Sequence, residues 1–188
     1  LTLAMMHEVA ADDPAWDDLL DELTPEEMYN LVRVGGYQTQ AVNSVGAPPT
    51  VCVDGPAYVG NAGTTGVTVS QKTYAWCSEV VISSTWNVDR AKTMGEQIGE
   101  DCLAQGDLNF AGWYAPSMNI HRTPFSGRNF EYYSEDGFMS GRFGAATVAG
   151  ARSKGVMTFV KHFALNDQET MRSVIATLSN EQAIREIY

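Results

Sequence analysis

A short apolar segment that ends in a cluster of polar side chains constrains the fold of this chain most strongly. Residues 156–160 follow Gly155 and are rich in β-branched and aromatic side chains, which predicts a short buried strand. From Lys161 to Arg172 the sequence turns to Lys, His, Asn, Gln, Glu and Arg. Enzymes of the α/β class build sites where buried parallel strands end in such side chains. An ordinary strand end that meets solvent carries the same residue types, so this segment alone does not distinguish a functional site from a solvated strand end.

Strand-like and helix-like segments alternate along the chain. Apolar stripes with capping residues predict helices at 15–34 (restarted by Thr24), 88–105, 138–154 and from 179 onward. Apolar runs predict strands at 50–53, 110–120 and 156–160, with polar loops over 57–73 and 121–136. The alternation favours an α/β fold of parallel βαβ units, as in part of a (β/α)8 (TIM) barrel. A nucleotide-binding sheet is the weaker alternative, because no glycine-rich phosphate motif follows any strand.

Composition narrows the classes of partner. The 188 residues carry a net charge of −11, which argues against nucleic acid and against an anionic membrane surface. No apolar run approaches the roughly 20 residues that span a bilayer. No leader is visible ahead of Leu1, which favours the cytoplasm, although a truncated start would leave the compartment open.

The cysteines and histidines give no support to a metal site or a cofactor. Cys52, Cys77 and Cys102 are odd in number and lack the paired spacing of metal ligands. We therefore predict three buried thiols in a reducing setting. With only three scattered histidines, we expect neither a metal nor a cofactor.

Three predicted strands end in polar side chains that a barrel would bring to one mouth. The residues concerned are Asp54, then Asn119, His121, Arg122 and Arg128, then Lys161 and His162. One carboxylate among several donors suits a polyhydroxylated ligand, because charge-assisted hydrogen bonds can then reach several hydroxyls. A phosphate would use the same cations but has no need of the carboxylate. Aromatic residues nearby could supply faces for a sugar ring, or could simply be core packing: Trp113, Tyr114, Tyr132 and Tyr133.

Four motifs in this order resemble glycoside hydrolase family three, the β-glucosidase group. They are Val53-Asp54-Gly55-Pro56, Ala115-Pro-Ser-Met-Asn119-Ile-His-Arg122, Gly127-Arg128-Asn-Phe-Glu131-Tyr-Tyr-Ser-Glu135-Asp136 and Lys161-His162-Phe-Ala-Leu-Asn166-Asp-Gln-Glu169. Segments 86–87, 95–100 and 180–188 are also similar to that family, so the resemblance runs from about residue 15 to the end.

The resemblance implies a barrel domain that hydrolyses terminal β-linked glucose or related sugars with retention of configuration, acting on a small β-glucoside or oligosaccharide. By position, the residues that match those holding the sugar hydroxyls are Asp54, Arg128, Lys161 and His162. Glu131 lies in the same motif and is expected to brace the loop. Behind Lys161 and His162, the residues expected to brace the loop are Asn166, Glu169 and Arg172.

The catalytic pair is expected to lie outside the chain. Retaining hydrolysis needs two carboxyl groups about 5–5.5 Å apart. In the family the nucleophile is an aspartate on a later barrel strand, and the acid/base is usually a glutamate from a second α/β domain. Neither has a counterpart here, and Glu135 and Asp136 do not match the positions of the catalysts.

The expected domain organisation follows from length. A full barrel takes roughly 250 residues, so this chain would supply about its first half. We expect a lead-in at 1–14 and a partial barrel domain at 15–188, truncated at its C-terminus and inactive alone. The rest of the barrel and the α/β domain would belong to the parent protein. A non-catalytic carbohydrate-binding module is the alternative if the 188 residues are the whole product.

The sequence departs from the family pattern after Asp54. Tyr58 and Val59 stand where the family usually has a glycine soon after the proline, which changes the local geometry of this loop. The related N-acetylglucosaminidases carry a His-Gly-rich loop after their Lys-His-Phe-Pro motif, whereas residues 161–169 here do not. The glucosidase-like branch is therefore favoured over that group, and a β-xylosidase or another specificity of the family stays open.

Overall fold

A four-stranded sheet with the order β1-β2-β3-β4 is the centre of the fold. The computed structural model describes residues 1–60, 73–106 and 110–188. The strands are β1 (Gln38–Thr39), β2 (Thr50–Asp54), β3 (Phe110–Tyr114) and β4 (Met157–Thr158). β2, β3 and β4 are parallel, as the alternation of strands and helices predicts, while β1 pairs antiparallel with β2. The α/β class and the partial barrel are thereby confirmed, and β1 was not predicted.

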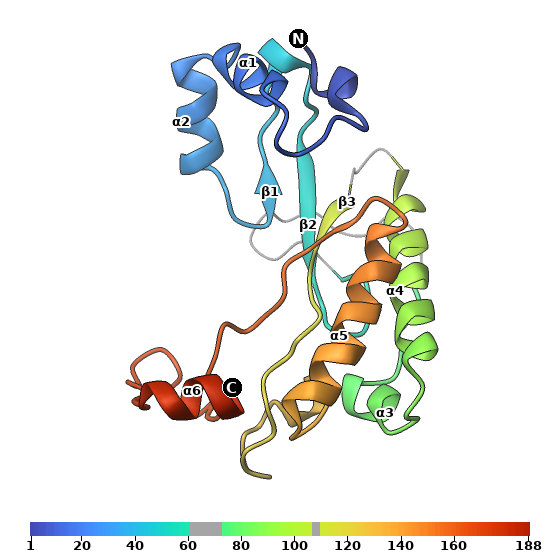
Figure 1. Cartoon of the computed structure of the whole chain (residues 1–188), viewed down its shortest axis with the longest axis vertical. Coiled ribbons are helices and arrows are strands. Elements are labelled where there is room, and N and C mark those ends of the chain that lie inside the picture. The colour runs from blue at the N-terminus through green and yellow to red at the C-terminus, as the bar shows by residue number, and fades with distance from the viewer. Residues whose placement is uncertain (61–72, 107–109) are drawn as a thin grey trace.

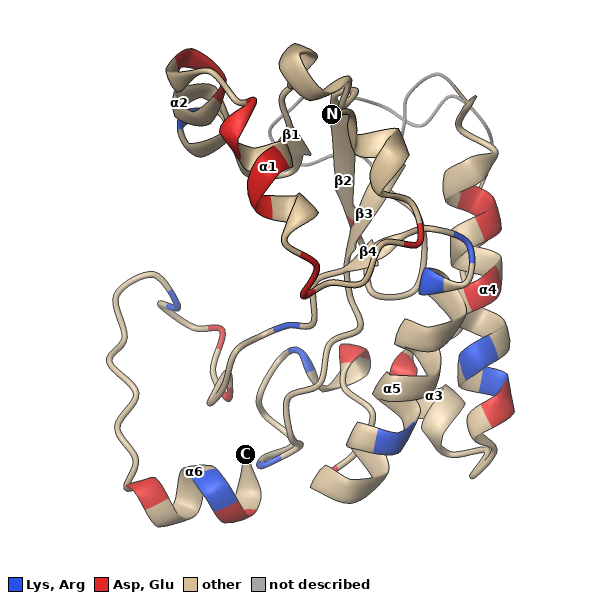
Figure 2. Cartoon of the chain, turned by 45° about the horizontal axis from the view of Figure 1, so that its top comes forward, with Lys and Arg blue, Asp and Glu red and all other residues tan. Residues whose placement is uncertain are grey.

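The helices follow the predicted order. They are η1 (Leu3–Met6), α1 (Ala15–Asp21), α2 (Pro25–Arg33), η2 (Asn43–Val45), α3 (Glu79–Ser83), α4 (Val88–Leu103), η5 (Asn129–Glu131), α5 (Gly137–Arg152) and α6 (Glu181–Ile187). Thr24 separates α1 from α2 with the predicted capping box, in which its hydroxyl accepts from the amide of Glu27. The short helix α3 was not predicted. Acidic side chains gather on α1 and α2 (Figure 2), as on a solvated helix face.

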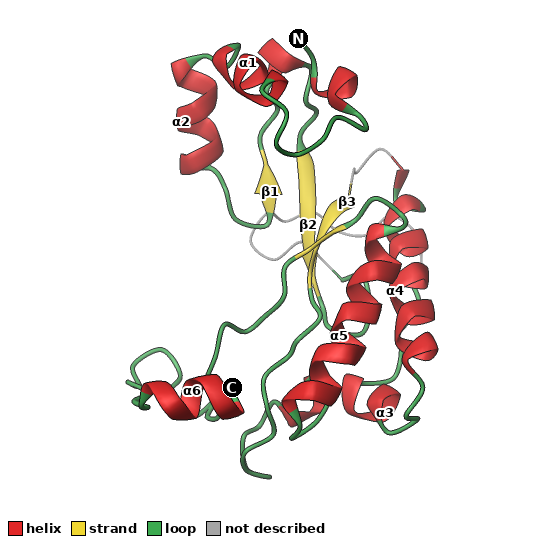
Figure 3. Cartoon of the chain, viewed as in Figure 1, coloured by secondary structure: helices red, strands yellow, loops and turns green. Residues whose placement is uncertain are grey.

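Helices α4 and α5 pack side by side along the sheet (Figures 1 and 3). Glycines allow this close approach. A Cβ atom on Gly150 of α5 would lie 2.8 Å from the amide nitrogen of Glu96, and one on Gly95 of α4 would lie 2.9 Å from that of Ala151. Because the two backbones nearly touch, no larger side chain fits at either position.

Two apolar clusters hold the chain together. The main one joins the sheet to α4 and α5 through Val53, Met94, Ile98, Trp113, Tyr133, Phe143 and Val156. Trp113 is fully buried and donates from its indole nitrogen to the carbonyl of Gly55, 2.7 Å away, which fixes the end of β2. A smaller cluster packs the N-terminal segment around Met6, Leu19, Val42 and Val45.

Two predicted strands are shorter in the structure than in the sequence analysis. The strand predicted over 110–120 ends at Tyr114, because Pro116 has no amide hydrogen to continue the ladder. The strand predicted over 156–160 is reduced to the two residues of β4, and Ser117 and Lys161 continue it as a single parallel bridge. That segment is also less buried than predicted, since β4 is the outermost strand of the described sheet and both Met157 and Val160 are exposed.

The cysteines depart from the prediction at one position. Cys52 and Cys102 are buried free thiols, and burial raises the pKa of Cys102 to about 12. Cys77 is exposed, because it lies in the irregular segment ahead of α3 and not on a packed element. Most of the predicted loop 57–73 lies outside the described residues. Within the described ranges, no helix combines the length and the apolar character that crossing a membrane requires.

Candidate functional site

The ends of β2 and β4 bring a carboxylate and an ammonium group together. Asp54 is the last residue of β2, and Lys161 lies just beyond β4. The Lys161 Nζ atom donates to Oδ1 of Asp54 at 2.6 Å, and the amide of Gly55 donates to the same oxygen at 2.8 Å. Burial alone would raise the pKa of Asp54, but the hydrogen bond and the charge of Lys161 outweigh it and hold the pKa below its usual value. Asp54 is therefore ionised at neutral pH.

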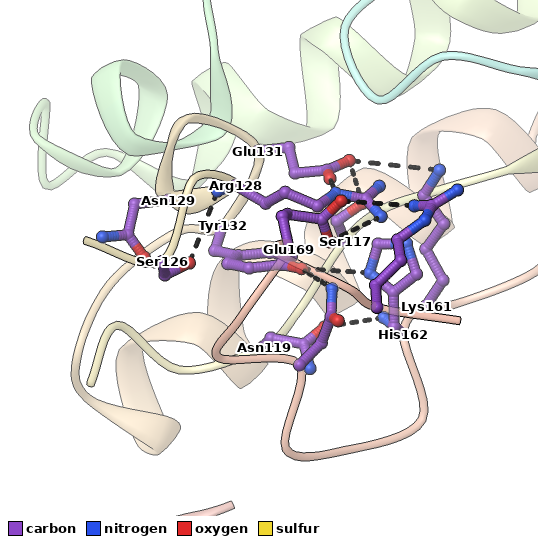
Figure 4. Close-up of polar contacts among 12 residues, drawn as sticks. Ser117, Asn119, Ser126, Arg128, Asn129, Glu131, Tyr132, Lys161, His162 and Glu169 are labelled. Atoms are coloured by element: carbon purple, nitrogen blue, oxygen red, sulfur yellow. Dashed lines mark hydrogen bonds and ion pairs between the residues drawn. The ribbon is translucent and has the colours of Figure 1, made fainter. Parts of the chain in front are cut away.

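Arg128 joins this pair from the loop that precedes η5. Its Nε atom donates to Oε1 of the buried Glu131, and its Nη1 atom lies 3.7 Å from Oε1 of Glu169 (Figure 4). Glu131 also accepts from the hydroxyl of Ser117 at 3.1 Å and lies 4.0 Å from Lys161. Burial opposes the charge of Arg128, but its hydrogen bond to Glu131 prevails and raises its pKa. Glu131 thus acts as the brace that orients both cations.

These residues line an open cavity of about 480 Å³. Its lining consists of Asp54, Gly55, Pro56, Tyr58, Arg128, Phe130, Glu131 and Lys161. A carboxylate that accepts and two cations that donate face one space, with aromatic rings beside them. Such a set can bind several hydroxyl groups of one ligand by charge-assisted hydrogen bonds.

His162, the fourth predicted binding residue, faces a neighbouring cavity of about 290 Å³. Its amide donates to Oδ1 of Asn119 at 2.7 Å, and its Nδ1 atom lies 3.1 Å from the hydroxyl of Tyr132 (Figure 4). Asn166 donates a hydrogen bond to that hydroxyl at 2.7 Å, so the hydroxyl can donate its own hydrogen bond to Nδ1 of His162. Burial first and then the charge of Arg128 lower the pKa of His162, which keeps the ring neutral. The structure therefore brings Asp54, Arg128 and Lys161 to one cavity and places His162 behind them.

Two other polar residues predicted at the mouth do not reach it. The Nε2 atom of His121 lies 3.0 Å from the carbonyl oxygen of Asn129 and 2.9 Å from that of Tyr132. The His121 side chain therefore contacts the backbone at η5 and does not face the cavity that holds Asp54. Arg122 lies over the ring of Tyr188, 5.8 Å from its centre. Backbone carbonyls thus hold His121, and an aromatic ring holds Arg122.

The aromatic residues near the strand ends pack inside the protein. Trp113, Tyr132 and Tyr133 are fully buried, and the ring of Tyr114 stacks on Phe159 with 4.6 Å between centres. These four aromatic residues therefore serve in packing. None of them lines the cavity that holds Asp54.

Tyr37 is a neighbour of the site that sequence reasoning missed. It directly precedes β1, its amide donates to the hydroxyl of Tyr114 at 3.2 Å, and its ring lies tilted against that of Tyr114, with 4.7 Å between centres. Burial, and then the charge of the nearby Asp54 carboxylate, raise the pKa of the Tyr37 hydroxyl. Its one signal in the sequence is the pair Gly35-Gly36, which ends a helix and redirects the chain.

The charged side chains that line the cavity are paired with one another. Both carboxylates that line the cavity are already paired with cations, Asp54 with Lys161 and Glu131 with Arg128. No group of three or more His, Cys, Asp or Glu residues in the described ranges is arranged to hold a metal ion. The fold and the site define an α/β protein in which a carboxylate and two cations face one cavity at the carboxyl ends of parallel strands.

Comparison with known proteins gives the family. Residues 52–187 match the glycosyl hydrolase family 3 N terminal domain, and the chain belongs to this family. Beta-glucosidase A from Butyrivibrio fibrisolvens is 38% identical over 96% of this chain and 22% of its own length. An exo-alpha-(1->6)-L-arabinopyranosidase from Bifidobacterium longum is 36% identical over 89% of this chain and 22% of its own length.

The solved structures agree with the relatives. Beta-glucosidase 3B from Thermotoga neapolitana, in complex with alpha-D-glucose, has a TM-score of 0.78 at 39% identity, over 92% of this chain and 26% of that one. The chain spans about a fifth of the length of the curated relatives it matches, 22% for beta-glucosidase A. It is thus similar to one part of each of these glycosidases.

Proposed function

We propose that this chain supplies the sugar-holding part of a retaining, exo-acting β-glycosidase of β-glucosidase type. In this proposal Asp54, Arg128 and Lys161 contact the hydroxyls of the terminal sugar. His162, whose neutral ring lies 3.1 Å from the Tyr132 hydroxyl, is the fourth contact and faces the neighbouring cavity. The observation that carries the proposal is the Asp54–Lys161 pair, 2.6 Å apart in an open cavity at the strand ends.

The pairing of the carboxylates supports binding and not bond cleavage. A nucleophile and an acid/base have to be free for attack and for proton transfer. Asp54 and Glu131 are each engaged by a cation within the described cavity. We therefore infer that the nucleophile and the acid/base come from other parts of the parent protein, and that residues 15–188 are a partial barrel domain behind a lead-in at 1–14.

Calorimetry with glucose or gluconolactone on the 188-residue chain tests the binding role. We expect measurable binding that Asp54→Asn weakens by about tenfold or more, because one charge-assisted hydrogen bond of roughly 1.5–3 kcal/mol is lost. Asp167→Asn, a change of the same chemistry that leaves this cavity intact, is the control. Equal affinity of wild type and Asp54→Asn would remove Asp54 from the site.

Hydrolysis tests the catalytic half of the proposal. A longer chain that includes the remaining barrel and the α/β domain should release the aryl group from an aryl β-glucoside, and the 188-residue chain should not. Turnover by the 188-residue chain would place the catalysts inside it. A non-catalytic carbohydrate-binding module is the second candidate, and it predicts sugar binding with no hydrolysis by any longer chain.

A further inference from the structure

The ring of His162 lies against the hydroxyl of a buried tyrosine. Its Nδ1 atom is 3.1 Å from the hydroxyl oxygen of Tyr132, and the two rings meet nearly at right angles, with 6.0 Å between centres (Figure 4). Tyr132 is only 1% exposed, so its hydroxyl has to find its hydrogen-bond partners inside the protein. The second partner is the side-chain amide of Asn166, whose Nδ2 atom donates to the hydroxyl at 2.7 Å. The three side chains therefore form one continuous set of hydrogen bonds.

The amide at one end of this set determines the direction of the other hydrogen bond. An amide nitrogen can only donate, so the Tyr132 oxygen accepts from Asn166. The one hydrogen of the hydroxyl is then free to point at Nδ1 of His162. A neutral imidazole has one protonated and one unprotonated nitrogen. Because Nδ1 accepts, the ring hydrogen of His162 lies on Nε2.

Both rings keep the protonation state that this arrangement needs. Burial is the main cause that raises the pKa of Tyr132 to about 12, so the phenol keeps its hydrogen at neutral pH. Burial and then the charge of Arg128 lower the pKa of His162, so its ring carries a single hydrogen there. The direction of the hydrogen bond between the two rings therefore follows from the contact with Asn166.

Backbone hydrogen bonds fix the position from which the His162 ring extends. The amide of His162 donates to Oδ1 of Asn119 at 2.7 Å. In the preceding residue, the amide of Lys161 donates to the carbonyl of Pro116 at 3.1 Å, and the carbonyl accepts from the amide of Met118 at 2.6 Å. The ring is thus held at its base and at Nδ1, and His162 lines the cavity of about 290 Å³. Nε2, the ring nitrogen farther from the backbone, is the one that can reach a ligand there.

We infer that Tyr132 and Asn166 are positioning residues that hold His162 in the Nε2–H tautomer, so that Nε2 donates a hydrogen bond to a hydroxyl of the sugar. The inference rests on the proposed function, in which His162 is one of the sugar contacts, and it gives that contact a direction. A hydroxyl that gives its own hydrogen to a carboxylate still has lone pairs, and a donating histidine can use them. The opposite tautomer would present a lone pair at Nε2 and could only accept.

The tautomer can be read by 15N NMR of the labelled 188-residue chain at pH 8, without any ligand. The chain has three histidines, and His162→Gln identifies the signals of His162 by their loss. We expect the shift of a protonated nitrogen at Nε2 and that of an unprotonated nitrogen at Nδ1. Asn166→Asp should move the hydrogen to Nδ1, because a carboxylate can only accept and the Tyr132 hydrogen turns toward it. Tyr132→Phe should leave a mixture of both tautomers.

Calorimetry with glucose connects the tautomer with binding. Asn166→Asp and Tyr132→Phe should each weaken the affinity by about two- to tenfold, which corresponds to the net contribution of one hydrogen bond. Two controls should change neither the tautomer nor the affinity. Tyr188→Phe removes a hydroxyl from the same cavity that donates to Asp167 and not to His162. Gln168→Glu adds the same charge as Asn166→Asp at an exposed position nearby.

The outcomes separate this inference from the proposal beneath it. Circular dichroism checks that each variant is folded, and the wild-type spectrum alone decides the tautomer where a variant is not. A hydrogen on Nδ1 in the wild type, or a tautomer that both variants leave unchanged, overturns the positioning role. Unchanged glucose affinity in a variant whose tautomer has changed overturns the donor role of Nε2. A wild type that shows the Nε2–H tautomer but binds no glucose overturns the proposed function, and the donor role with it, while the tautomer assignment stands.

Discussion

Glu79 is a buried carboxyl group whose ionisation should make the stability of the protein depend on pH. It is the first residue of α3, it is fully buried, and neither carboxyl oxygen has a hydrogen-bond partner in the part of the chain that the structure describes. Burial raises its pKa from 4.5 to about 9, and the negative charge of Glu131 adds to the rise. The positive charge of Lys161 offsets only part of that shift. The group is therefore a neutral acid at pH 7.

The magnitude follows from linkage between protonation and folding. Below pH 4.5 Glu79 is protonated in both the folded and the unfolded chain, and its protonation has no effect on stability. Between pH 4.5 and 9 only the unfolded chain releases the proton, so the free energy of unfolding falls by about 1.4 kcal/mol per pH unit. At pH 7, 2.5 units above 4.5, the wild type has lost about 3 kcal/mol.

Glu79→Gln removes this dependence, because glutamine has the shape of the protonated acid and does not titrate. Urea unfolding of both proteins, followed by tryptophan fluorescence between pH 4.5 and 8, measures the difference in the free energy of unfolding. We expect the variant to gain on the wild type by about 3 kcal/mol from pH 4.5 to 7. The buried amide of glutamine lowers the stability of the variant by a constant amount at every pH. The test is therefore how the difference in unfolding free energy between variant and wild type changes with pH, and not its sign at one pH.

Glu135→Gln, which changes an exposed carboxylate in the same way, controls for net charge. Two parallel pH curves for Glu79→Gln and the wild type would contradict the reasoning. They would show that Glu79 is ionised in the folded protein and has a partner there.

Three further predictions concern packing and the site. Gly150→Val should lower the free energy of unfolding by about 3 kcal/mol or more, because the valine side chain would meet the backbone of α4. Gly141→Val, on the open face of α5, should cost far less, and equal melting temperatures of the two variants would contradict this. The pKa of Asp54 lies below its ordinary value of 3.8, so the ionised carboxylate pairs with Lys161 above pH 3.8 and loses this pairing as the pH falls through the lowered pKa. Sugar binding should therefore weaken in that acidic range and stay constant above pH 5, which a calorimetric pH series would show. Tyr37→Phe should weaken glucose binding a few-fold by removing the phenol beside Asp54, whereas Tyr74→Phe should leave it unchanged.

The long helices could be predicted because their signals are local. Asn87 caps α4 through the amide of Asp89, and the apolar stripe of α4 faces the sheet as its spacing requires. The strands are harder, since β1 has only two residues and no apolar pattern of its own. It exists because it pairs with β2, and Tyr37 reaches Asp54 only through that pairing.

The site divides in the same way. Asp54 and Lys161 are 107 residues apart in sequence, yet the prediction joins them because parallel strands end at one edge of the sheet. The same argument predicts that His121 and Arg122 lie at this edge beside Asp54, but in the structure they do not reach its cavity. Carbonyl groups of the loop over 129–132 capture His121, and the ring of Tyr188 takes Arg122. Strand order is thus enough to predict which segments meet, whereas the direction of a side chain depends on loop contacts that have no signal in the sequence.

The arrangement around Asp54 distinguishes a residue that contacts the ligand from one that supports it. Glu131 is buried and engaged by Arg128, Ser117 and Lys161, so it has no surface to offer a sugar. The Asp54 side chain is 42% exposed, and Lys161 and Gly55 both donate to one of its oxygens, Oδ1. The carboxylate is thus ionised and fixed in direction while much of it faces the cavity. A sugar hydroxyl can then donate to Asp54 without breaking the pair, because a carboxylate accepts several hydrogen bonds. Replacing Glu131 should consequently disorder Arg128 and Lys161, whereas replacing Asp54 should remove a contact to the sugar.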